Sequence, residues 1–344
     1  MTEEALPMSE SPARNQPGTL LLQRREVAAL LDLDECIQAV EDAFRLHAEG
    51  NSLPPGVLSA YVPGGGFHVK AAGLKLERPY FAAKFNGNFP GNMLRFGLPN
   101  IQGVILLCDA ENGSPLALMD SIEITIQRTA AATAVATRRL ARPESAVLTL
   151  CGCGNQGRAH LRALARVLPL KRAFAWDADA ARAQAFAREF SGRLGADVHA
   201  VEQPSAAVRQ SDVCVTCTSA RGWFLAREDV RPGTFVAAVG ADSPDKQEIE
   251  PPLMAASKVV VDSLVQCAEF GELHHALAAG VVARDSVWAE LADVVAGRKP
   301  GRTAPDEITL FDSTGVALED VAAALAVYRR ALREGAGRRM DFAA

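Results

Sequence analysis

The chain of 344 residues is long enough for two domains, each with a substantial hydrophobic core. Apolar residues make up 49% of the sequence and charged residues 22%, a balance typical of an ordinary soluble globular protein. The formal net charge of -5 disfavours nucleic acid or an anionic membrane surface as a partner.

Residues 1–18 are polar, acidic and Pro-rich, and they lack the charged and apolar regions of a signal peptide. We expect a disordered lead segment there and a cytoplasmic protein. No later run reaches the roughly 18 consecutive apolar residues that a transmembrane helix needs, so we expect no membrane partner. The seven cysteines lie in strand-like or helical contexts, which is typical of buried thiols in a reducing compartment.

The first part of the chain is predicted to be mixed α+β. Residues 32–50 have apolar side chains at helical spacing, acidic residues near the start and Gly50 just past the end, which predicts an amphipathic helix. Residues 53–120 alternate or run apolar between Pro, Gly and Asn, which indicates antiparallel strands. Asn112-Gly113 predicts a hairpin, because both residues tolerate positive φ.

The remainder of the chain alternates between strands and helices after a predicted helix over residues 122–141. The candidate strands are residues 145–152, 172–177, 198–201, 213–218, 234–240, 258–263 and 308–314. This alternation is typical of a parallel, doubly wound α/β sheet. A last helix is predicted from about residue 315 to residue 334, in a position to pack back on the first domain.

A G-x-G-x-x-G loop follows the first of these strands and precedes a helical segment. Gly152 allows the tight turn, Gly154 lets a pyrophosphate approach the backbone, and Gly157 lets helix and strand pack closely. The start of the helix supplies free N–H groups, so we predict that these glycines bind a dinucleotide together with Asn155 and Gln156.

Asp177 ends the next predicted strand, where an acidic side chain would accept hydrogen bonds from the adenosine ribose hydroxyls. Asp179 adds negative charge, and no arginine follows at once to bind a 2′-phosphate. The sequence therefore favours NAD over NADP. A glycine turn that binds another nucleotide, or none, is the alternative.

The cysteines and histidines are not predicted to bind a metal. Cys151 and Cys153 interrupt the glycine loop, but the other ligands that zinc needs are missing at suitable spacing. Cys214 and Cys217 form C-x-x-C within a predicted strand, where residues three apart point to opposite faces. We expect the cysteines to be packed small side chains, and His160 to be structural or solvated.

Several stretches together resemble the ornithine cyclodeaminase and mu-crystallin family. They are residues 82–92, 109–120, 123–145, 151–158, 238–249, 271–280 and 309–320. The resemblance spans roughly residues 30–330. It implies a homodimer with a substrate-binding and dimerisation domain (19–127 plus 316–344) and a Rossmann dinucleotide-binding domain (128–315).

The resemblance also implies NAD(P)-dependent chemistry at the Cα–N bond of a small amino or imino acid. Ornithine cyclodeaminases convert L-ornithine to L-proline and ammonia by hydride transfer to and from bound NAD. Relatives reduce cyclic ketimines of the pyrroline-2-carboxylate type or act as L-amino acid dehydrogenases. A nucleotide-binding crystallin-like protein without catalysis is the alternative from another class.

Arg128 and Lys84 match two functional positions of that family. Arg128 corresponds to the carboxylate-binding arginine, whose planar fork suits bidentate recognition, and Thr129 beside it would lie near the cofactor phosphates. Lys84 corresponds to the active-site lysine and lies in an otherwise apolar strand, where burial without a partner is unfavourable. The alternatives are a helix-surface arginine and an edge-strand lysine facing water.

Asp242 follows a predicted strand end and matches the family's catalytic aspartate, which would take and give the amine proton. A pKa raised by burial would suit that role, and the alternative is a turn or N-cap aspartate. Lys246 and Glu248 are predicted to form a structural ion pair.

Ser313 and Gly315 end the last predicted strand and open the last helix, so they could face the nicotinamide end of the cofactor or the substrate. Thr218 and Ser219 end another strand and are predicted to line the cofactor cleft. A purely structural cap or turn is the alternative for each of them.

One departure from the family pattern concerns the substrate. Members that handle ornithine usually carry an arginine in a P-x-R-like setting, where this chain has Gly56. Lys70 could supply the missing cation, with His68 on the same strand face, or both could be strand surface. The departure weakens the ornithine assignment within the amino or imino acid class.

Overall fold

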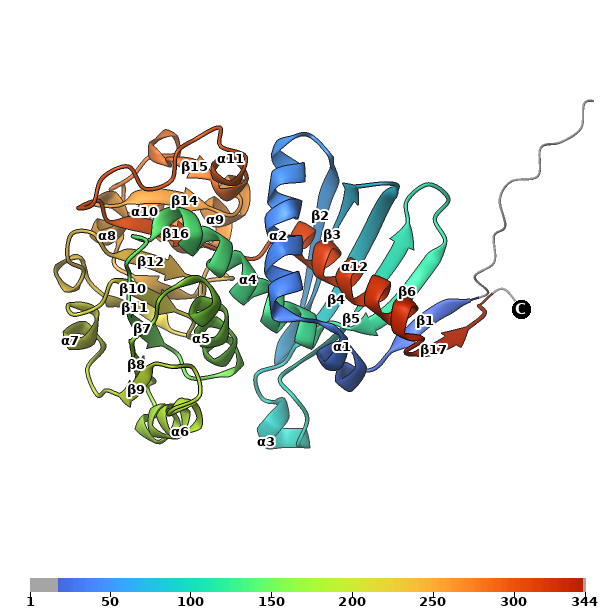
Figure 1. The fold of residues 1–344 in the computed structure, drawn as a ribbon, viewed down its shortest axis with the longest axis horizontal. Helices are drawn as coiled ribbons and strands as arrows, with labels where there is room; N and C mark the ends of the chain where they lie inside the picture. Colours follow the sequence, from blue (N-terminus) through green and yellow to red (C-terminus); the bar gives the residue numbers. More distant parts are fainter. Residues whose placement is uncertain (1–17, 343–344) are drawn as a thin grey trace, which may run out of the picture.

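The computed structural model describes residues 18–342 of the chain. Within that range the strands form two large sheets that lie side by side, with helix α4 (Ile122–Leu140) between them (Figure 1). The lead segment predicted over residues 1–18 lies, apart from Gly18, outside the described residues. No helix of the described chain is long and apolar enough to cross a membrane.

The C-terminal sheet is the predicted parallel, doubly wound sheet. Its described strands run in the order β15-β14-β16-β12-β10-β7-β8-β9, and every neighbouring pair is parallel. Their bounds are β7 Val147–Cys151, β8 Arg172–Trp176, β9 Asp197–Ala200, β10 Val213–Thr216, β12 Phe235–Ala238, β14 Lys258–Val261, β15 Ala289–Glu290 and β16 Thr309–Asp312. All of the predicted strands are present, and only the two-residue β15 is additional.

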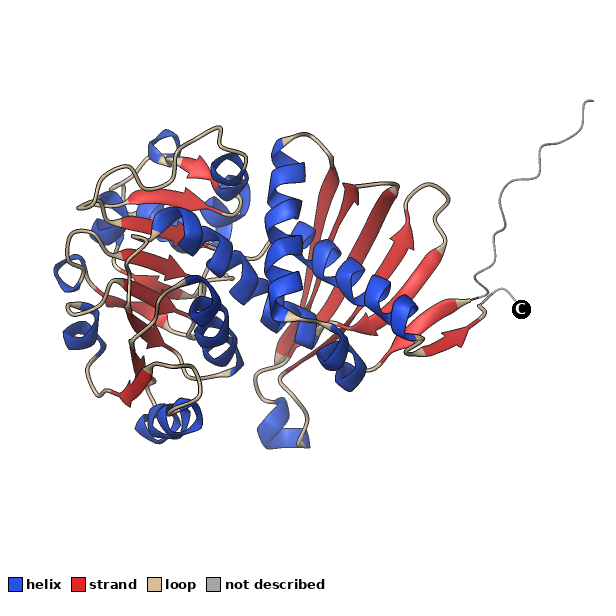
Figure 2. Ribbon diagram, in the orientation of Figure 1, coloured by secondary structure: helices blue, strands red, loops and turns tan. Residues whose placement is uncertain are grey.

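Helices connect these strands and cover both faces of the parallel sheet (Figure 2). Their bounds are α5 Asn155–Val167, α6 Ala180–Phe190, α7 Pro204–Val208, α8 Pro251–Ala255, α9 Leu264–Phe270, α10 Glu272–Ala278 and α11 Leu291–Val295. A small parallel sheet of β11 (Arg221–Leu225) and β13 (Gln247–Ile249) also lies in this half. The chain turns from β7 to β8 on one side and later resumes with β10 on the other, so the topological switch point lies between β7 and β10.

The N-terminal sheet is mixed. Its described strands run in the order β17-β1-β6-β5-β4-β3-β2, and β1 is parallel to β6. Their bounds are β1 Thr19–Leu22, β2 Ser52–Val62, β3 Gly65–Lys75, β4 Pro79–Asn88, β5 Ile101–Asp109, β6 Pro115–Asp120 and β17 Arg338–Met340. The predicted antiparallel run is confirmed as β2 to β6, whereas β1, β17, α1 (Arg24–Leu30) and α3 (Asn92–Phe96) had not been predicted.

The predicted hairpin joins β5 and β6, but its turn differs from the expected one. Gly113 alone has positive φ, at +78°, and no non-glycine residue of the described chain does. The Asp109 carboxylate accepts hydrogen bonds from the Glu111 N–H at 2.9 Å and from Asn112 Nδ2 at 3.2 Å. These side-chain contacts stabilise a longer loop than a two-residue turn.

Two long helices cover one face of the mixed sheet (Figures 1 and 2). Helix α2 (Leu33–Ala48) begins after Asp32, whose carboxylate accepts from two N–H groups of the first turn. Helix α12 (Ala317–Glu334) ends at Gly335, whose φ is +64°. The last helix therefore packs back on the first half of the chain, as predicted, and its first turn faces the junction with the parallel sheet.

Candidate active site

The glycine loop lies at the switch point of the parallel sheet and has the geometry that its sequence predicts. Gly152 has a φ of +108°, which an L side chain rarely adopts. A Cβ on Gly157 would overlap the carbonyl oxygen of Gly152, so helix α5 can approach β7 this closely only without a side chain there. A Cβ on Gly154 would meet nothing within 4 Å, which leaves the space that a pyrophosphate needs.

The start of α5 and the end of β8 offer further groups to a dinucleotide. The side-chain oxygen Oε1 of Gln156 is buried without a hydrogen-bond partner among the described residues. The Asp177 carboxylate accepts from the Cys153 N–H at 2.9 Å and from the Asp179 N–H at 3.0 Å. Asp177 thus braces the glycine loop, and it lies at the strand end where the prediction places a ribose.

Two buried cations occupy the junction between the sheets. Lys84 on β4 and Arg128 on α4 are each 5% exposed. Lys84 Nζ lies 2.7 Å from Asp320 Oδ2. Arg128 Nε lies 3.1 Å from Asp320 Oδ1, and its Nη1 lies 2.8 Å from Glu319 Oε2. The surface alternatives for Lys84 and Arg128 are therefore wrong, because both side chains are enclosed and paired with the first turn of α12.

Burial and pairing shift the pKa values of this network in different directions. Burial lowers the pKa of Lys84 to about 8 despite the opposing charge of Asp320. Burial would raise the pKa of Asp320, but Lys84 and Arg128 outweigh it and lower that pKa. Burial raises the pKa of Glu319 to about 7 even beside Arg128. The guanidinium stays charged, since the two carboxylates outweigh its burial and raise the pKa of Arg128.

Lys70 joins these cations from the neighbouring strand. Lys70 on β3 pairs in register with Lys84 on β4, so the two side chains share one face of the mixed sheet. Lys70 Nζ donates to the carbonyl oxygens of Gly315 at 2.7 Å and Thr314 at 3.1 Å. Burial lowers the pKa of Lys70. Lys70 is therefore directed into the junction, and the strand-surface alternative is wrong for it.

Gly315 itself lies against Arg128. Its φ is +76°, and a Cβ at this position would overlap the guanidinium. The predicted substrate-site residues Lys70, Arg128 and Gly315 thus come together from β3, α4 and the turn before α12. Gly56 lies on the edge strand β2 opposite Ala71 and has open space around it.

Asp242 follows β12 and faces the same junction from the parallel sheet. Its negative charge acts on Lys70 and His68, opposing the lowering of their pKa values by burial. The side chain of Asp242 is 55% exposed and lies 2.6 Å from Lys246 Nζ, so burial does not tune this carboxylate. An exposed strand-end carboxylate that faces two basic groups is accessible to a molecule entering the junction.

The predicted ion pair between Lys246 and Glu248 is also wrong. Lys246 pairs with Asp242 instead. The buried Glu248 carboxylate accepts from the Thr216 hydroxyl at 2.6 Å, from the Thr218 N–H and hydroxyl at 2.6 Å, and from the Gly240 N–H at 2.9 Å. Glu248 therefore fixes the ends of two adjacent strands.

The hydroxyl residues predicted near the cofactor have structural partners. Thr129 Oγ1 donates to the Thr125 carbonyl at 2.8 Å, and the Thr218 hydroxyl bonds to Glu248. Ser313 Oγ donates to Asp262 at 3.0 Å, whereas Ser219 is exposed. Their roles in cofactor binding stay predictions.

His160 and the cysteines have the structural character that was expected. His160 is fully buried, with Nδ1 2.8 Å from the Gln156 carbonyl and Nε2 3.0 Å from the Thr133 hydroxyl. Burial lowers the pKa of His160 to about 4, so the ring is neutral near pH 7. All seven cysteines are free thiols.

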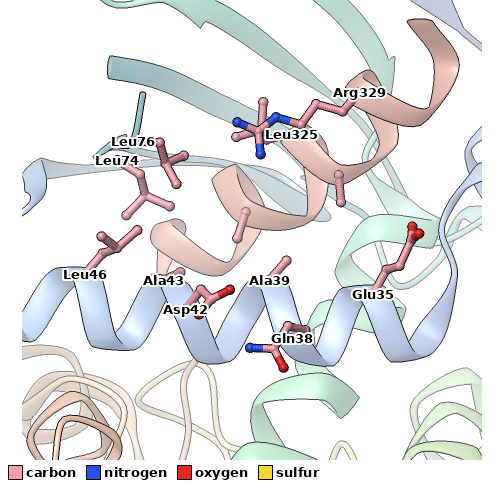
Figure 3. Close-up of a pocket in the computed structure, with 12 residues that line it drawn as sticks. Glu35, Gln38, Ala39, Asp42, Ala43, Leu46, Leu74, Leu76, Leu325 and Arg329 are labelled. Atoms are coloured by element: carbon pink, nitrogen blue, oxygen red, sulfur yellow. The ribbon is translucent and has the colours of Figure 1, made fainter. Parts of the chain in front are cut away.

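A separate groove of about 270 Å³ lies between α2 and α12 (Figure 3). Leu46, Leu74, Leu76 and Leu325 line it together with Arg329, whose side chain reaches beside Leu325. Arg329 pairs with Glu77 at 2.5 Å. None of the predicted site residues lines this groove.

Three acidic residues of the junction were missed by the sequence reasoning: Asp262, Glu319 and Asp320. Glu319 and Asp320 interrupt the apolar first half of α12, and Asp262 follows a buried strand. Two adjacent carboxylates inside an apolar helical pattern are unfavourable without cationic partners, and that signal could have identified them.

Comparison with known proteins places this architecture in a family. The model of the ornithine cyclodeaminase/mu-crystallin family matches residues 18–335. An archaeal alanine dehydrogenase dimer with bound NAD is 37% identical, with a TM-score of 0.90 and coverage of 94% of this chain and 99% of that chain. The Δ1-pyrroline-2-carboxylate reductase of Thermococcus litoralis, in complex with NADH and L-proline, is 34% identical with a TM-score of 0.90 and coverage of 94% and 100%.

A lysine cyclodeaminase that recognises L-lysine, L-ornithine and L-2,4-diaminobutyric acid is also similar. It is 31% identical with a TM-score of 0.81, and the match covers 94% of this chain and 96% of that chain. The parallel sheet, the mixed sheet apart from β17, the glycine loop and the junction between the sheets lie within the matched residues. The chain belongs to the ornithine cyclodeaminase/mu-crystallin family.

Proposed function

We propose that the protein is an NAD(P)-dependent enzyme that acts at the Cα–N bond of a small amino or imino acid. The observation that carries this proposal is the meeting of Lys70, Lys84 and Arg128 opposite Asp242, beside the end of the parallel sheet. Three cations suit a substrate carboxylate, and an exposed aspartate suits a proton shuttle at the neighbouring nitrogen.

The residues of the glycine loop fit a dinucleotide, and NAD is the proposed cofactor. Gly152, Gly154, Asn155, Gln156 and Gly157 would hold its pyrophosphate, supported by the open space at Gly154 and the start of helix α5 directly after it. Asp177 would accept from the adenosine ribose. The bound nicotinamide supplies the hydride acceptor or donor.

The chain's own residues would bind the substrate and move its proton. Arg128 would hold the substrate carboxylate with the Nη2 end of its fork, for which no acceptor is recorded among the described residues. Lys70 and Lys84 add positive charge beside it. Asp242 would exchange Lys246 for the substrate amine, accept a proton when the amine becomes an imine, and return that proton in the reverse direction.

We infer that dehydrogenation of an amino acid or reduction of its imine fits this junction best, because an arginine is missing at Gly56 and Lys70 occupies the neighbouring strand. Ornithine cyclodeamination is the second candidate, supported by the likeness to the lysine cyclodeaminase. Both use the same cations and the same aspartate.

A substrate panel with both cofactors tests the proposal. Stoichiometric NADH consumption with pyrroline-2-carboxylate would identify a reductase, and net NADH from an L-amino acid would identify a dehydrogenase. Proline and ammonia from ornithine, with catalytic NAD+ and no net NADH, would identify a cyclodeaminase. Tight nucleotide binding without turnover of any amino or imino acid would favour the non-catalytic alternative and contradict the proposal.

Replacing Asp177 with Ser should shift cofactor preference toward NADP. The carboxylate repels a 2′-phosphate, and like charges brought together cost several kcal/mol, so the NADP-to-NAD ratio of kcat/KM should rise by roughly tenfold or more. Arg158 lies nearby, with Nη1 2.6 Å from the Cys153 carbonyl, and would favour the added phosphate. Asp179→Asn is the control, because the asparagine keeps a side-chain oxygen at the N-cap. An unchanged NADP-to-NAD ratio of kcat/KM in Asp177→Ser would remove the argument for NAD.

Binding of a substrate carboxylate should weaken as the pH rises through about 8, because the buried Lys84 then loses its proton. Below that pH the ammonium attracts the carboxylate, and above it the neutral amine does not. The dissociation constant of pyrrole-2-carboxylate, an unreactive planar analogue, should be measured from pH 6 to 10 with NADH present. In Lys84→Arg the dissociation constant should no longer rise at alkaline pH. The same rise in the variant and in the wild type would contradict a role of the Lys84 charge in carboxylate binding.

We propose a homodimer formed through the outer face of the mixed sheet, which α2 and α12 leave uncovered. Strand alternation buries Ile105 and Leu107 on the inner face and exposes the apolar side chains of the outer face. The outer face comprises Leu58, Val62, Phe85, Val104 and Leu106. Exposed apolar patches of this kind are typical of protein interfaces. This assignment supports the proposed division into a dimerisation domain (19–127 plus 316–344) and a cofactor domain (128–315).

Leu106→Lys should weaken the dimer, because two-fold symmetry would bring two like charges into an apolar interface. The dimer dissociation constant should rise by roughly 100-fold or more in sedimentation equilibrium. Val265→Lys, on an exposed apolar residue of α9, is the matched control and should leave the dimer intact. A Leu106→Lys protein with the wild-type dissociation constant would place the interface elsewhere.

The cytoplasmic location is likewise proposed. All seven cysteines are free thiols, and such thiols persist in reducing compartments.

A further inference from the structure

Asp262 lies where two neighbouring parallel strands end. It directly follows β14, and its N–H donates to the Asp312 carbonyl at the end of β16, at 3.1 Å. Its side chain is 5% exposed, and no ion pair to it is recorded among the described residues. The charge of Asp262 acts on Lys70 and Arg128, but neither cation is recorded as bonding to it, so neutral hydrogen-bond donors satisfy its oxygens.

Those donors come chiefly from one turn. Oδ2 of Asp262 accepts from the Gly315 N–H at 2.6 Å and from Ser313 Oγ at 3.0 Å. Oδ1 accepts from Thr314 Oγ1 at 3.3 Å and from Cys267 Sγ at 3.2 Å. Consecutive residues 313–315 thus converge on a single carboxylate, which fixes the path of the backbone between β16 and α12.

The same turn sets the positions of two cations of the junction. The carbonyl oxygens of Thr314 and Gly315 accept from Lys70 Nζ at 3.1 and 2.7 Å. The bare Cα of Gly315, held at a φ of +76°, leaves just enough room for the Arg128 guanidinium. A shift of this turn would therefore break the hydrogen bonds of Lys70 and bring Gly315 too close to the Arg128 guanidinium.

We propose that Asp262 is a positioning residue that holds the 313–315 turn so that Lys70 and Arg128 keep the spacing needed to bind the carboxylate of an amino or imino acid. The inference rests on the proposed function, because it assumes that these cations bind a carboxylate. Asp262 acts through the turn and does not contact the substrate. It therefore affects carboxylate affinity more than it affects binding of the cofactor's pyrophosphate at the glycine loop.

Asp262→Asn tests this role, because the amide has nearly the same size but loses the charge and one of the two acceptor atoms. Hydrogen bonds to a charged group contribute about 1.5–3 kcal/mol, so the dissociation constant of pyrrole-2-carboxylate should rise roughly tenfold to a hundredfold. The affinity for NADH should change less than the affinity for the carboxylate, since the glycine loop is remote from the turn in the sheet and only Ser313 of the turn is a predicted cofactor contact. In turnover assays KM should rise more than kcat falls.

Cys267→Ala is the matched control. It removes the donor that comes from α9 and leaves all three bonds to the turn, so carboxylate affinity should stay within about twofold. If Cys267→Ala weakens carboxylate binding as much as Asp262→Asn, the effect is general loosening and the proposal is overturned. Wild-type carboxylate affinity in Asp262→Asn would overturn it directly.

Two further outcomes separate this inference from the proposed function. The wild type could bind pyrrole-2-carboxylate and yet turn over no amino or imino acid. The proposed reaction then fails, whereas the affinities of the wild type and Asp262→Asn for the analogue still decide the role of Asp262. If the wild type does not bind the analogue, both fail. If Asp262→Asn misfolds and loses NADH binding, the variant Thr314→Val tests the proposal instead. It removes one donor to Asp262, so the dissociation constant of pyrrole-2-carboxylate should rise about three- to fivefold. An unchanged dissociation constant in Thr314→Val would overturn the proposal.

Discussion

Asp242→Asn should lower kcat by roughly 100- to 10,000-fold, the range that a positioned acid–base group contributes. The amide can still accept a hydrogen bond, but it cannot take the proton that the substrate nitrogen releases. Steady-state turnover with the best substrate of the panel gives the effect on kcat, and fluorescence titration gives the affinity for NADH. We expect that affinity to be unchanged, because Asp242 lies apart from the glycine loop in sequence and follows a different strand.

Asp245→Asn provides the matched control for that experiment. Asp245 lies in the same loop, is exposed, and pairs with Arg221 at 3.1 Å rather than facing the buried cations. Its substitution should leave turnover within about twofold of the wild type. Turnover by Asp242→Asn within about threefold of the wild type would sink the proton-shuttle assignment and return Asp242 to the role of a turn residue.

Arg128→Met should lower the free energy of unfolding by about 3–5 kcal/mol, because removing one member of a buried charge pair leaves its partners uncompensated. Glu319 would lose its cation, whereas Asp320 would keep Lys84 at 2.7 Å. The change should be measured by urea denaturation at a fixed protein concentration. Binding of pyrrole-2-carboxylate should be lost as well, since Arg128 is the proposed carboxylate ligand.

The double variant Arg128→Met with Glu319→Gln separates the two effects. It removes the uncompensated charge and keeps a side-chain oxygen in place of Glu319 Oε1, which accepts from the Val316 N–H at 3.4 Å. Stability should recover in large part, whereas carboxylate binding should not. A single variant as stable as the wild type would mean that the buried Glu319 takes up a proton when Arg128 is removed, and so needs no cation.

The strands of the parallel sheet were predictable because strands buried on both faces read as apolar runs, as in β10, β12 and β14. The glycine loop was predictable for a related reason, since the glycines, the preceding strand and the following helix are all local in sequence. Short edge strands were not predictable. β1 and β17 lie at opposite ends of the described chain and exist only because they pair with each other and β1 with β6.

The sequence by itself determined the order of elements, the dinucleotide loop and the types of residue at the site, and a resemblance pointed to Lys84, Arg128 and Asp242. Only the tertiary structure decided which charges meet. Arg128 and Glu319 are 191 positions apart in sequence, yet they lie 2.8 Å apart. Tertiary packing also leaves Asp242 exposed and pairs it with Lys246. It likewise brings residues 313–315 together around the Asp262 carboxylate. Local patterns fix backbone conformation, whereas the neutralisation of a buried charge depends on partners that only packing brings together.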